Sequence, residues 1–184
     1  MKADAEAILA AMGAPEKTQI LRGGDPWWHP GRHGRICLGP KKVLGVFGEL
    51  HPRVLAAMGV KGPVMGFTLW PQEVPLPRKS GATRPALQIN DLQAVERDFA
   101  FVVDADVEAL TLVNAAMGAD KTLIEDVRVF DEFIGGSLGE GRKSLAITVR
   151  MRPVDRTLKD AEIEAVGKKI VEKVTKATGG TLRG

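Results

Sequence analysis

Hydrophobic and polar residues alternate most regularly over residues 143–152. Apolar side chains occupy every second position: Leu145, Ile147, Val149 and Met151. Most of the intervening positions are polar, so this pattern predicts a strand with one face in a core and the other in solvent. Apolar runs with turn residues at their ends predict two more strands, at residues 98–103 and 124–133.

Apolar residues spaced three and four apart predict two helices among these strands. The first follows Asp106 as a possible N-cap and ends at Gly118. Its expected buried face consists of Val107, Leu110, Val113 and Met117. The second follows residues 157–160, whose Thr and Asp have the form of a capping box. Its expected buried face consists of Ile163, Val166, Ile170 and Val174.

A short last strand at residues 181–183 completes the order β-α-β-β-α-β. This is the ferredoxin-like arrangement, in which two helices cover one face of a four-stranded antiparallel sheet. Residues 98 and 100 then lie on the free face of the first strand, while Phe99 and Phe101 point toward the helices. The fold class predicted for the whole chain is α+β.

The first part of the chain predicts a smaller set of elements. A helix is expected near residues 5–12 and strands at 35–38, 43–50 and 64–70, with a short helix beginning at Pro52. This block is typical of the end of a larger α/β module. Four prolines then exclude a continuous helix or central strand: Pro71, Pro75, Pro77 and Pro85. We therefore predict two domains, at residues 1–75 and 87–184, joined by a proline-rich linker at 76–86.

Charge is distributed unevenly along the chain. The net charge is +6 over residues 1–86, −9 over 87–141 and +6 over 142–184, although the total is only +3. A basic segment of this kind indicates a surface for nucleic acid. A solvated helix face is the other interpretation, and charge alone favours it.

Neither a metal site nor a catalytic group emerges from the sequence. Three residues separate His29 from His33, but a zinc site needs about four ligands. Cys37 and Glu49 would complete such a set only by coincidence. Residues 29–31 are better explained as a turn. The glycine-rich run at 135–141 precedes a strand, whereas a phosphate-binding loop precedes a helix. We therefore expect a hairpin loop there, no cofactor or metal, and no catalysis by this chain alone.

The apolar runs are too short to cross a membrane, which takes about 20 residues. The single cysteine is compatible with a reducing compartment, so a cytoplasmic protein is expected.

The free face of the predicted sheet lacks a row of aromatic side chains, so contact with RNA there depends on arginine and lysine. We expect Phe130 to be the one exposed ring that is available for stacking. Basic side chains beside it are expected to converge on one polyanion. The candidate residues for binding nucleic acid are Phe130, Arg142, Lys143, Arg150, Arg152, Arg156 and Lys159.

Five segments of the chain together resemble one known family. They are residues 96–103 (ERDFAFVV), 129–133 (VFDEF), 141–146 (GRKSLA), 156–163 (RTLKDAEI) and 182–183 (LR). In this order they resemble the ferredoxin-fold anticodon-binding domain that ends the β subunit of bacterial phenylalanyl-tRNA synthetases. Residues 29–32 (HPGR) and 45–52 (GVFGELHP) are similar to the segment just upstream, which belongs to a catalytically silent copy of the class II synthetase core.

The resemblance implies a role in aminoacylation. The whole enzyme would attach phenylalanine to its tRNA with ATP and magnesium, as an α₂β₂ assembly whose α subunit holds the active site. This chain would bind the anticodon region of phenylalanine tRNA and help to dock the α subunit, without catalysing. A free-standing ferredoxin-like regulatory module that binds a small molecule is the alternative, and it leaves the basic C-terminal segment unexplained.

Overall fold

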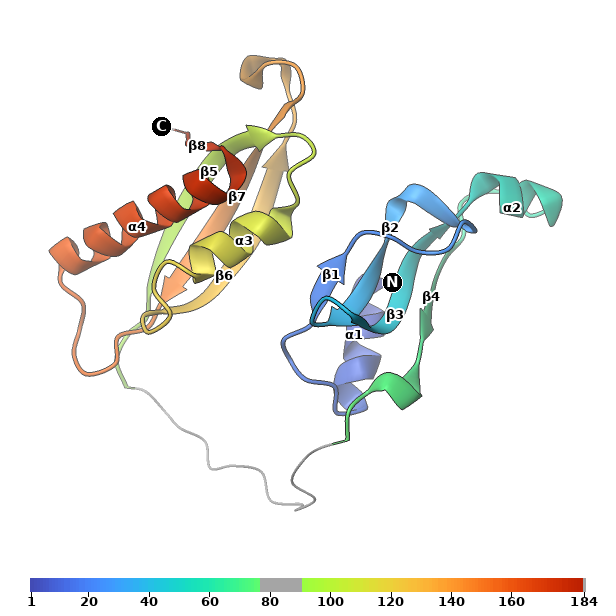
Figure 1. Ribbon diagram of the computed structural model, residues 1–184, viewed down its shortest axis with the longest axis horizontal. Helices are drawn as coiled ribbons and strands as arrows, with labels where there is room; N and C mark the ends of the chain where they lie inside the picture. Colours follow the sequence, from blue (N-terminus) through green and yellow to red (C-terminus); the bar gives the residue numbers. More distant parts are fainter. Residues whose placement is uncertain (77–90, 184) are drawn as a thin grey trace. The chain divides into compact units, whose positions relative to one another are not determined.

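The computed structural model describes residues 1–76 and 91–183, and the chain divides into two compact units, Met1–Pro85 and Ala86–Gly184 (Figure 1). Both units combine helices with an antiparallel sheet, so the chain is α+β as predicted. The proline-rich linker predicted at 76–86 lies, apart from its first residue, outside the described residues. None of the described helices combines the length and apolar character needed to cross a bilayer.

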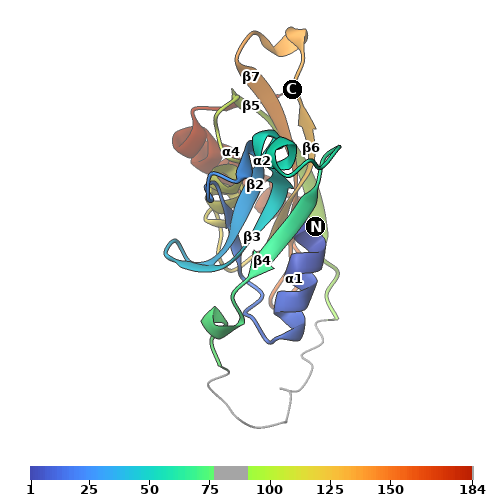
Figure 2. The ribbon, with the colours of Figure 1, turned by 90° about the vertical axis from the view of Figure 1, so that its right-hand side faces the viewer.

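The N-terminal unit is built on a four-stranded sheet in the order β1-β2-β3-β4. The strands are β1 (Gln19–Leu21), β2 (Trp28–Leu38), β3 (Lys42–Leu50) and β4 (Met65–Leu69). Helix α1 (Lys2–Ala11) packs on one face, where Ala5, Leu9, Ile36 and Leu44 form a small buried core (Figure 2). The short helices α2 (Pro52–Ala57) and η1 (Pro71–Glu73) flank β4 along the chain.

Strand β2 is longer than predicted, because the turn expected at residues 29–31 lies inside it. Trp28 pairs with Leu50 and His33 with Gly48, so β2 advances five residues while β3 advances two. The excess residues bulge out, and the backbone N–H of Gly31 donates to Nδ1 of His29 at 3.1 Å. A bulge of this kind accommodates the proline at position 30, which has no N–H for the ladder.

The C-terminal unit has the predicted ferredoxin-like topology. Its strands are β5 (Val95–Asp104), β6 (Ile124–Phe133), β7 (Arg142–Met151) and β8 (Thr181–Leu182), in the sheet order β6-β7-β5-β8. Helices α3 (Ala109–Met117) and α4 (Asp160–Thr178) lie on the same face of this sheet (Figure 1). A single turn, η2 (Gly136–Leu138), lies in the glycine-rich connection between β6 and β7.

The core of this unit lies between the sheet and the two helices. Phe101 is fully buried, as are Ile147 and Val149 of the alternating strand and Ile170 and Val174 of α4. The predicted buried faces of β7 and α4 are therefore confirmed.

The predicted buried face of α3 is wrong in part. The buried residues are Leu112 and Ala116, because the helix begins at Ala109 and not directly after Asp106. A turn follows β5 first, and in it the backbone N–H of Val107 donates to the carbonyl of Asp104 at 3.1 Å. Of the predicted residues, Val107, Val113 and Met117 pack against the core while partly exposed.

The first turn of α4 also differs from the prediction. The N-cap is Lys159 and not the threonine at position 157, so the capping arrangement is shifted by two residues. The carboxylate of Glu162 accepts from the backbone N–H of Lys159 at 2.9 Å. The same carboxylate accepts two hydrogen bonds from the Arg156 guanidinium, at 2.9 and 2.7 Å. Hydrogen bonding to Arg156, and then to the Lys159 N–H, lowers the pKa of Glu162 from 4.5 to about 2.

Stability of the C-terminal unit is expected to respond to acid through Glu162. Because the pKa of this carboxyl is lowered in the folded state, its contribution is complete above pH 4.5 and is lost as the pH falls toward 2. Glu162→Gln keeps an acceptor for the Lys159 N–H but removes the charge. The thermal midpoint, measured by circular dichroism between pH 5 and 2, should therefore fall less steeply in the variant than in the wild type.

Glu164 provides the matched control for this experiment. It lies in the same helix, is exposed, and makes no ion pair within residues 1–76 and 91–183. Glu164→Gln should leave the acid dependence unchanged. Equal effects from the two substitutions would show that net charge, and not the Arg156–Glu162 pair, determines the response.

Candidate functional site

The face of the C-terminal sheet that points away from α3 and α4, here called the open face, is the candidate site. The register of the two central strands, β5 and β7, determines which side chains lie on this face, because directly paired residues share a face. The open-face pairs of β5 and β7 are Glu96–Arg150, Asp98–Thr148, Ala100–Ala146, Val102–Ser144 and Asp104–Arg142. Charged residues therefore occupy both ends of the open face, and small residues occupy its middle.

One charged end of the open face is organised around Glu125 of β6. Its carboxylate lies 3.0 Å from Nε of Arg150 and 2.8 Å from Nε of Arg152. Arg150 also lies 3.5 Å from Glu96 across the sheet. The hydrogen bond from Arg152, supported by Arg150, holds the pKa of Glu125 below its usual value. The two arginines thus come together as expected, but carboxylates already balance their charge.

The other charged end contains Arg142. Its Nε lies 3.3 Å from Asp104, and its Nη2 donates to the carbonyl of Val102 at 3.2 Å. Arg142 and Arg150 are eight residues apart on one strand, which corresponds to roughly 26 Å. One small ligand therefore cannot contact both, whereas a folded polynucleotide can.

Three other sequence-derived candidates lie away from the open face. The side chain of Lys143 is only 9% exposed and pairs with Glu132 at 3.1 Å, on the side of the sheet that faces the helices. Arg156 is held by Glu162 before α4, and Lys159 is exposed at the N-cap of that helix. The structure therefore does not bring all seven candidates to one point.

The middle of the open face forms a low surface, here called the central strip, made by Ala100, Val102, Ser144 and Ala146. Two larger side chains reach over it from opposite edges of the sheet, and Ser144 beneath them is only 4% exposed. Phe133 of β6 pairs with Ser144, and the Arg183 guanidinium lies 5.8 Å from the centre of the Phe133 ring. Arg183 follows β8, and its backbone N–H donates to the carbonyl of Ala100 at 2.7 Å. A cation above an aromatic ring is an attractive arrangement.

The expectation that Phe130 is the one exposed ring is wrong, because Phe133 is also exposed. Phe130 is 56% exposed and Phe133 is 42% exposed. Simple alternation from Val127 and Val129 places residue 133 on the helix side of β6. The register shifts between Val129 and Asp131, where Phe130 lies in a bulge, and this shift turns Phe133 to the open face. Nothing in the local sequence marks that bulge.

Arg128 is a second open-face residue that the sequence interpretation missed. It pairs with Thr148 and is exposed. Among the described residues it makes no ion pair, in contrast to Arg142, Arg150 and Arg152. The signal was present in the sequence, because Arg128 lies between the inward-pointing Val127 and Val129.

Within residues 1–76 and 91–183, the His, Cys, Asp and Glu side chains form no group of three or more that is placed to hold a metal ion. The chemistry that the open face does offer is stacking on a ring, together with guanidinium contacts to anions.

Comparison with known proteins finds two family models that match the chain. Residues 91–183 match the model of the ferredoxin-fold anticodon-binding domain, and residues 1–70 match that of the phenylalanyl tRNA synthetase beta chain CLM domain.

Similar proteins include phenylalanine–tRNA ligase beta subunits of Ruegeria pomeroyi, 82% identical over 183 residues, and Cereibacter sphaeroides, 65% identical over 187 residues. Each comparison covers 100% of this chain and 23% of the relative, so the chain spans about a quarter of the length of these relatives. The chain therefore belongs to the phenylalanyl-tRNA synthetase β-chain family and contains its ferredoxin-fold anticodon-binding domain.

Proposed function

We propose that the C-terminal unit binds the anticodon region of phenylalanine tRNA through the open face. The observation that carries this proposal is the central strip with Phe133 and Arg183 beside it. Single-stranded RNA is recognised mainly by stacking of unpaired bases and by guanidinium contacts. The Phe133 ring is 42% exposed and the Arg183 guanidinium lies over it, so a base that stacks on the ring brings its phosphate close to a cation.

The basic residues divide into two groups in this proposal. Arg128 and Arg183 contribute positive charge without a carboxylate partner among the described residues. Arg142, Arg150 and Arg152 contact phosphates only by sharing their acidic partners or giving them up. In this proposal the three arginines still contact RNA at the ends of the open face, and Phe130 is a second ring on which a base can stack. Lys143, Arg156 and Lys159 would contact only RNA that extends beyond the open face.

The proposal extends to the whole enzyme from which the family takes its name. The chain would act within a β subunit that assembles with α subunits as α₂β₂ in the cytoplasm. Attachment of phenylalanine to tRNA, with ATP and magnesium, would take place on the α subunit. We place the anticodon-binding domain at residues 87–184, the end of the silent synthetase-like module at 1–75, and a linker at 76–86. The two separate cores support this division.

Binding of phenylalanine tRNA tests the function directly. The chain should bind this tRNA more tightly than the same tRNA with a substituted anticodon, because unpaired bases supply the specific contacts. Fluorescence anisotropy with labelled tRNA measures both affinities. Equal affinity for the two tRNAs would contradict anticodon recognition. It would favour the alternative, a regulatory module that binds a small molecule.

The salt dependence of binding tests Arg128. A cation that contacts a phosphate releases counterions, so its removal lowers the salt slope by about one unit. We expect Arg128→Ala to weaken tRNA binding and to flatten the slope in this way. Lys173→Ala is the matched control, because Lys173 is exposed on α4, which covers the opposite face. Equal effects from both variants would indicate a diffuse basic surface.

A further inference from the structure

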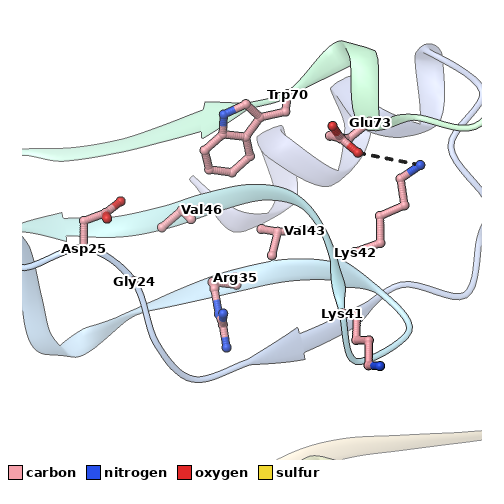
Figure 3. A pocket seen from close by; sticks show the side chains of 9 residues that line it. All are labelled: Gly24, Asp25, Arg35, Lys41, Lys42, Val43, Val46, Trp70 and Glu73. Carbon is pink, nitrogen blue, oxygen red and sulfur yellow. Dashed lines mark ion pairs between the residues drawn. The ribbon is translucent and has the colours of Figure 1, made fainter.

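The N-terminal unit contains a pocket that the proposed tRNA contact does not use. The pocket has a volume of about 800 Å³ and is lined by Gly24, Asp25, Arg35, Lys41, Lys42, Val43, Val46, Trp70 and Glu73. Figure 3 shows it over β2, β3 and the residues that follow β4. Its volume lies within the range of small-molecule sites, about 300–1,000 Å³, and it is a broad depression open to solvent.

The lining residues are arranged in a definite order across the strands (Figure 3). Val43 and Val46 of β3 lie in the middle, and the indole of Trp70 points toward Val46 from the β4 side. Arg35 pairs with Val46 from the other side, on β2. Two strand spacings separate Arg35 from the strand that leads to Trp70, roughly 10 Å. The Arg35 guanidinium extends farther from Trp70, toward the carbonyl of Arg22 (Figure 3), so an elongated ligand with a flat ring at one end and an anionic group at the other matches the two positions.

The basic side chains that line the pocket have only some of their hydrogen-bonding and ion-pairing partners within the described residues. Arg35 donates from Nη2 to the carbonyl of Arg22 at 3.0 Å, which fixes the guanidinium. Its Nε is buried and has no hydrogen-bond partner within the described ranges. Lys42 pairs with Glu73 at 3.7 Å, whereas Lys41 is exposed and makes no ion pair with any described residue. Arg35 thus supplies a cation held by the backbone, and Lys41 supplies an exposed one.

We propose that this pocket binds a nucleoside monophosphate, with the base against Trp70 and the valines and the phosphate at Arg35 and Lys41. Asp25, exposed at one end of the pocket, accepts hydrogen bonds from sugar hydroxyls. A carboxylate at this end disfavours ligands with two separated anionic groups. The inference does not depend on the proposed contact with tRNA, which concerns the other unit.

Calorimetric titration of the full chain with AMP, adenosine and inorganic phosphate tests the proposal. AMP should bind at least about tenfold more tightly than either part alone, because the two halves of the pocket act together. Intrinsic fluorescence should change with the same affinity, through Trp70. Absence of AMP binding at millimolar concentration, or equal affinities for AMP and adenosine, would overturn the proposal.

Three variants locate the site. Lys41→Gln should weaken AMP binding and leave adenosine binding unchanged, whereas Trp70→Leu should weaken both. Arg53→Gln, an exposed arginine on α2 outside the pocket, should change neither. Thermal melts establish that each variant is folded. Unchanged AMP affinity in both folded pocket variants would place any binding elsewhere and contradict the proposal.

Discussion

Phe133→Ala is expected to weaken binding of phenylalanine tRNA by about 5- to 150-fold. Loss of one base-stacking contact costs roughly 1–3 kcal/mol, which corresponds to this range of affinity. The ring is 42% exposed, so its removal should cost little stability. Phe133→Tyr should retain most of the affinity, because a phenol ring presents the same stacking face. Anisotropy titrations at one fixed salt concentration provide the measurement.

Phe130→Ala distinguishes the two exposed rings. Phe130 lies in the bulge of β6, while Phe133 lies beside the central strip and under the Arg183 guanidinium. We therefore expect Phe130→Ala to lose less affinity for tRNA than Phe133→Ala. A larger loss from Phe130 than from Phe133 would move the stacking position to the bulge and would restore the expectation drawn from the sequence.

The largest effect on stability is expected from Phe101→Ala. Phe101 is fully buried at the centre of the C-terminal core. Truncation of a buried phenylalanine to alanine costs about 3–5 kcal/mol, a large share of the 5–15 kcal/mol that stabilises a typical domain. Urea unfolding followed by far-ultraviolet circular dichroism should show the transition of the C-terminal unit at a much lower denaturant concentration.

Tryptophan fluorescence provides an internal control for this measurement. All three tryptophans belong to the N-terminal unit: Trp27, Trp28 and Trp70. The fluorescence transition should therefore be unchanged in Phe101→Ala, and should shift in Leu9→Ala, which truncates a side chain 2% exposed in the N-terminal core. A shift of the fluorescence transition in Phe101→Ala would show that the two units unfold together.

The sequence predicted the C-terminal fold well because local patterns and the overall fold agree there. The alternation from Leu145 to Met151 and the helical spacing from Ile163 to Val174 each place a full apolar face in one core. The start of α3 was less predictable, since an exposed aspartate at 106 has the composition of an N-cap. Only the turn after β5 shows that the helix begins later, at Ala109.

The candidate site was harder to predict than the fold. The arginines at 150 and 152 were identified, but their carboxylate partners come from β5 and β6, which no spacing along the chain reveals. Phe133 was missed because one additional residue in β6 reverses the faces of all residues after it. Arg183 lies against this ring only because the end of the chain returns to the edge of β5.

That returning segment has a consequence for synthesis on the ribosome. Strand β5 is made early in the domain, but its outer edge pairs with β8, where Phe101 is opposite Leu182. Pairs so distant along the chain form slowly, and unpaired strand edges favour association with other chains. Strand β8 begins three residues after α4 ends at Thr178, so the edge of β5 stays unpaired until almost the whole domain has been synthesised.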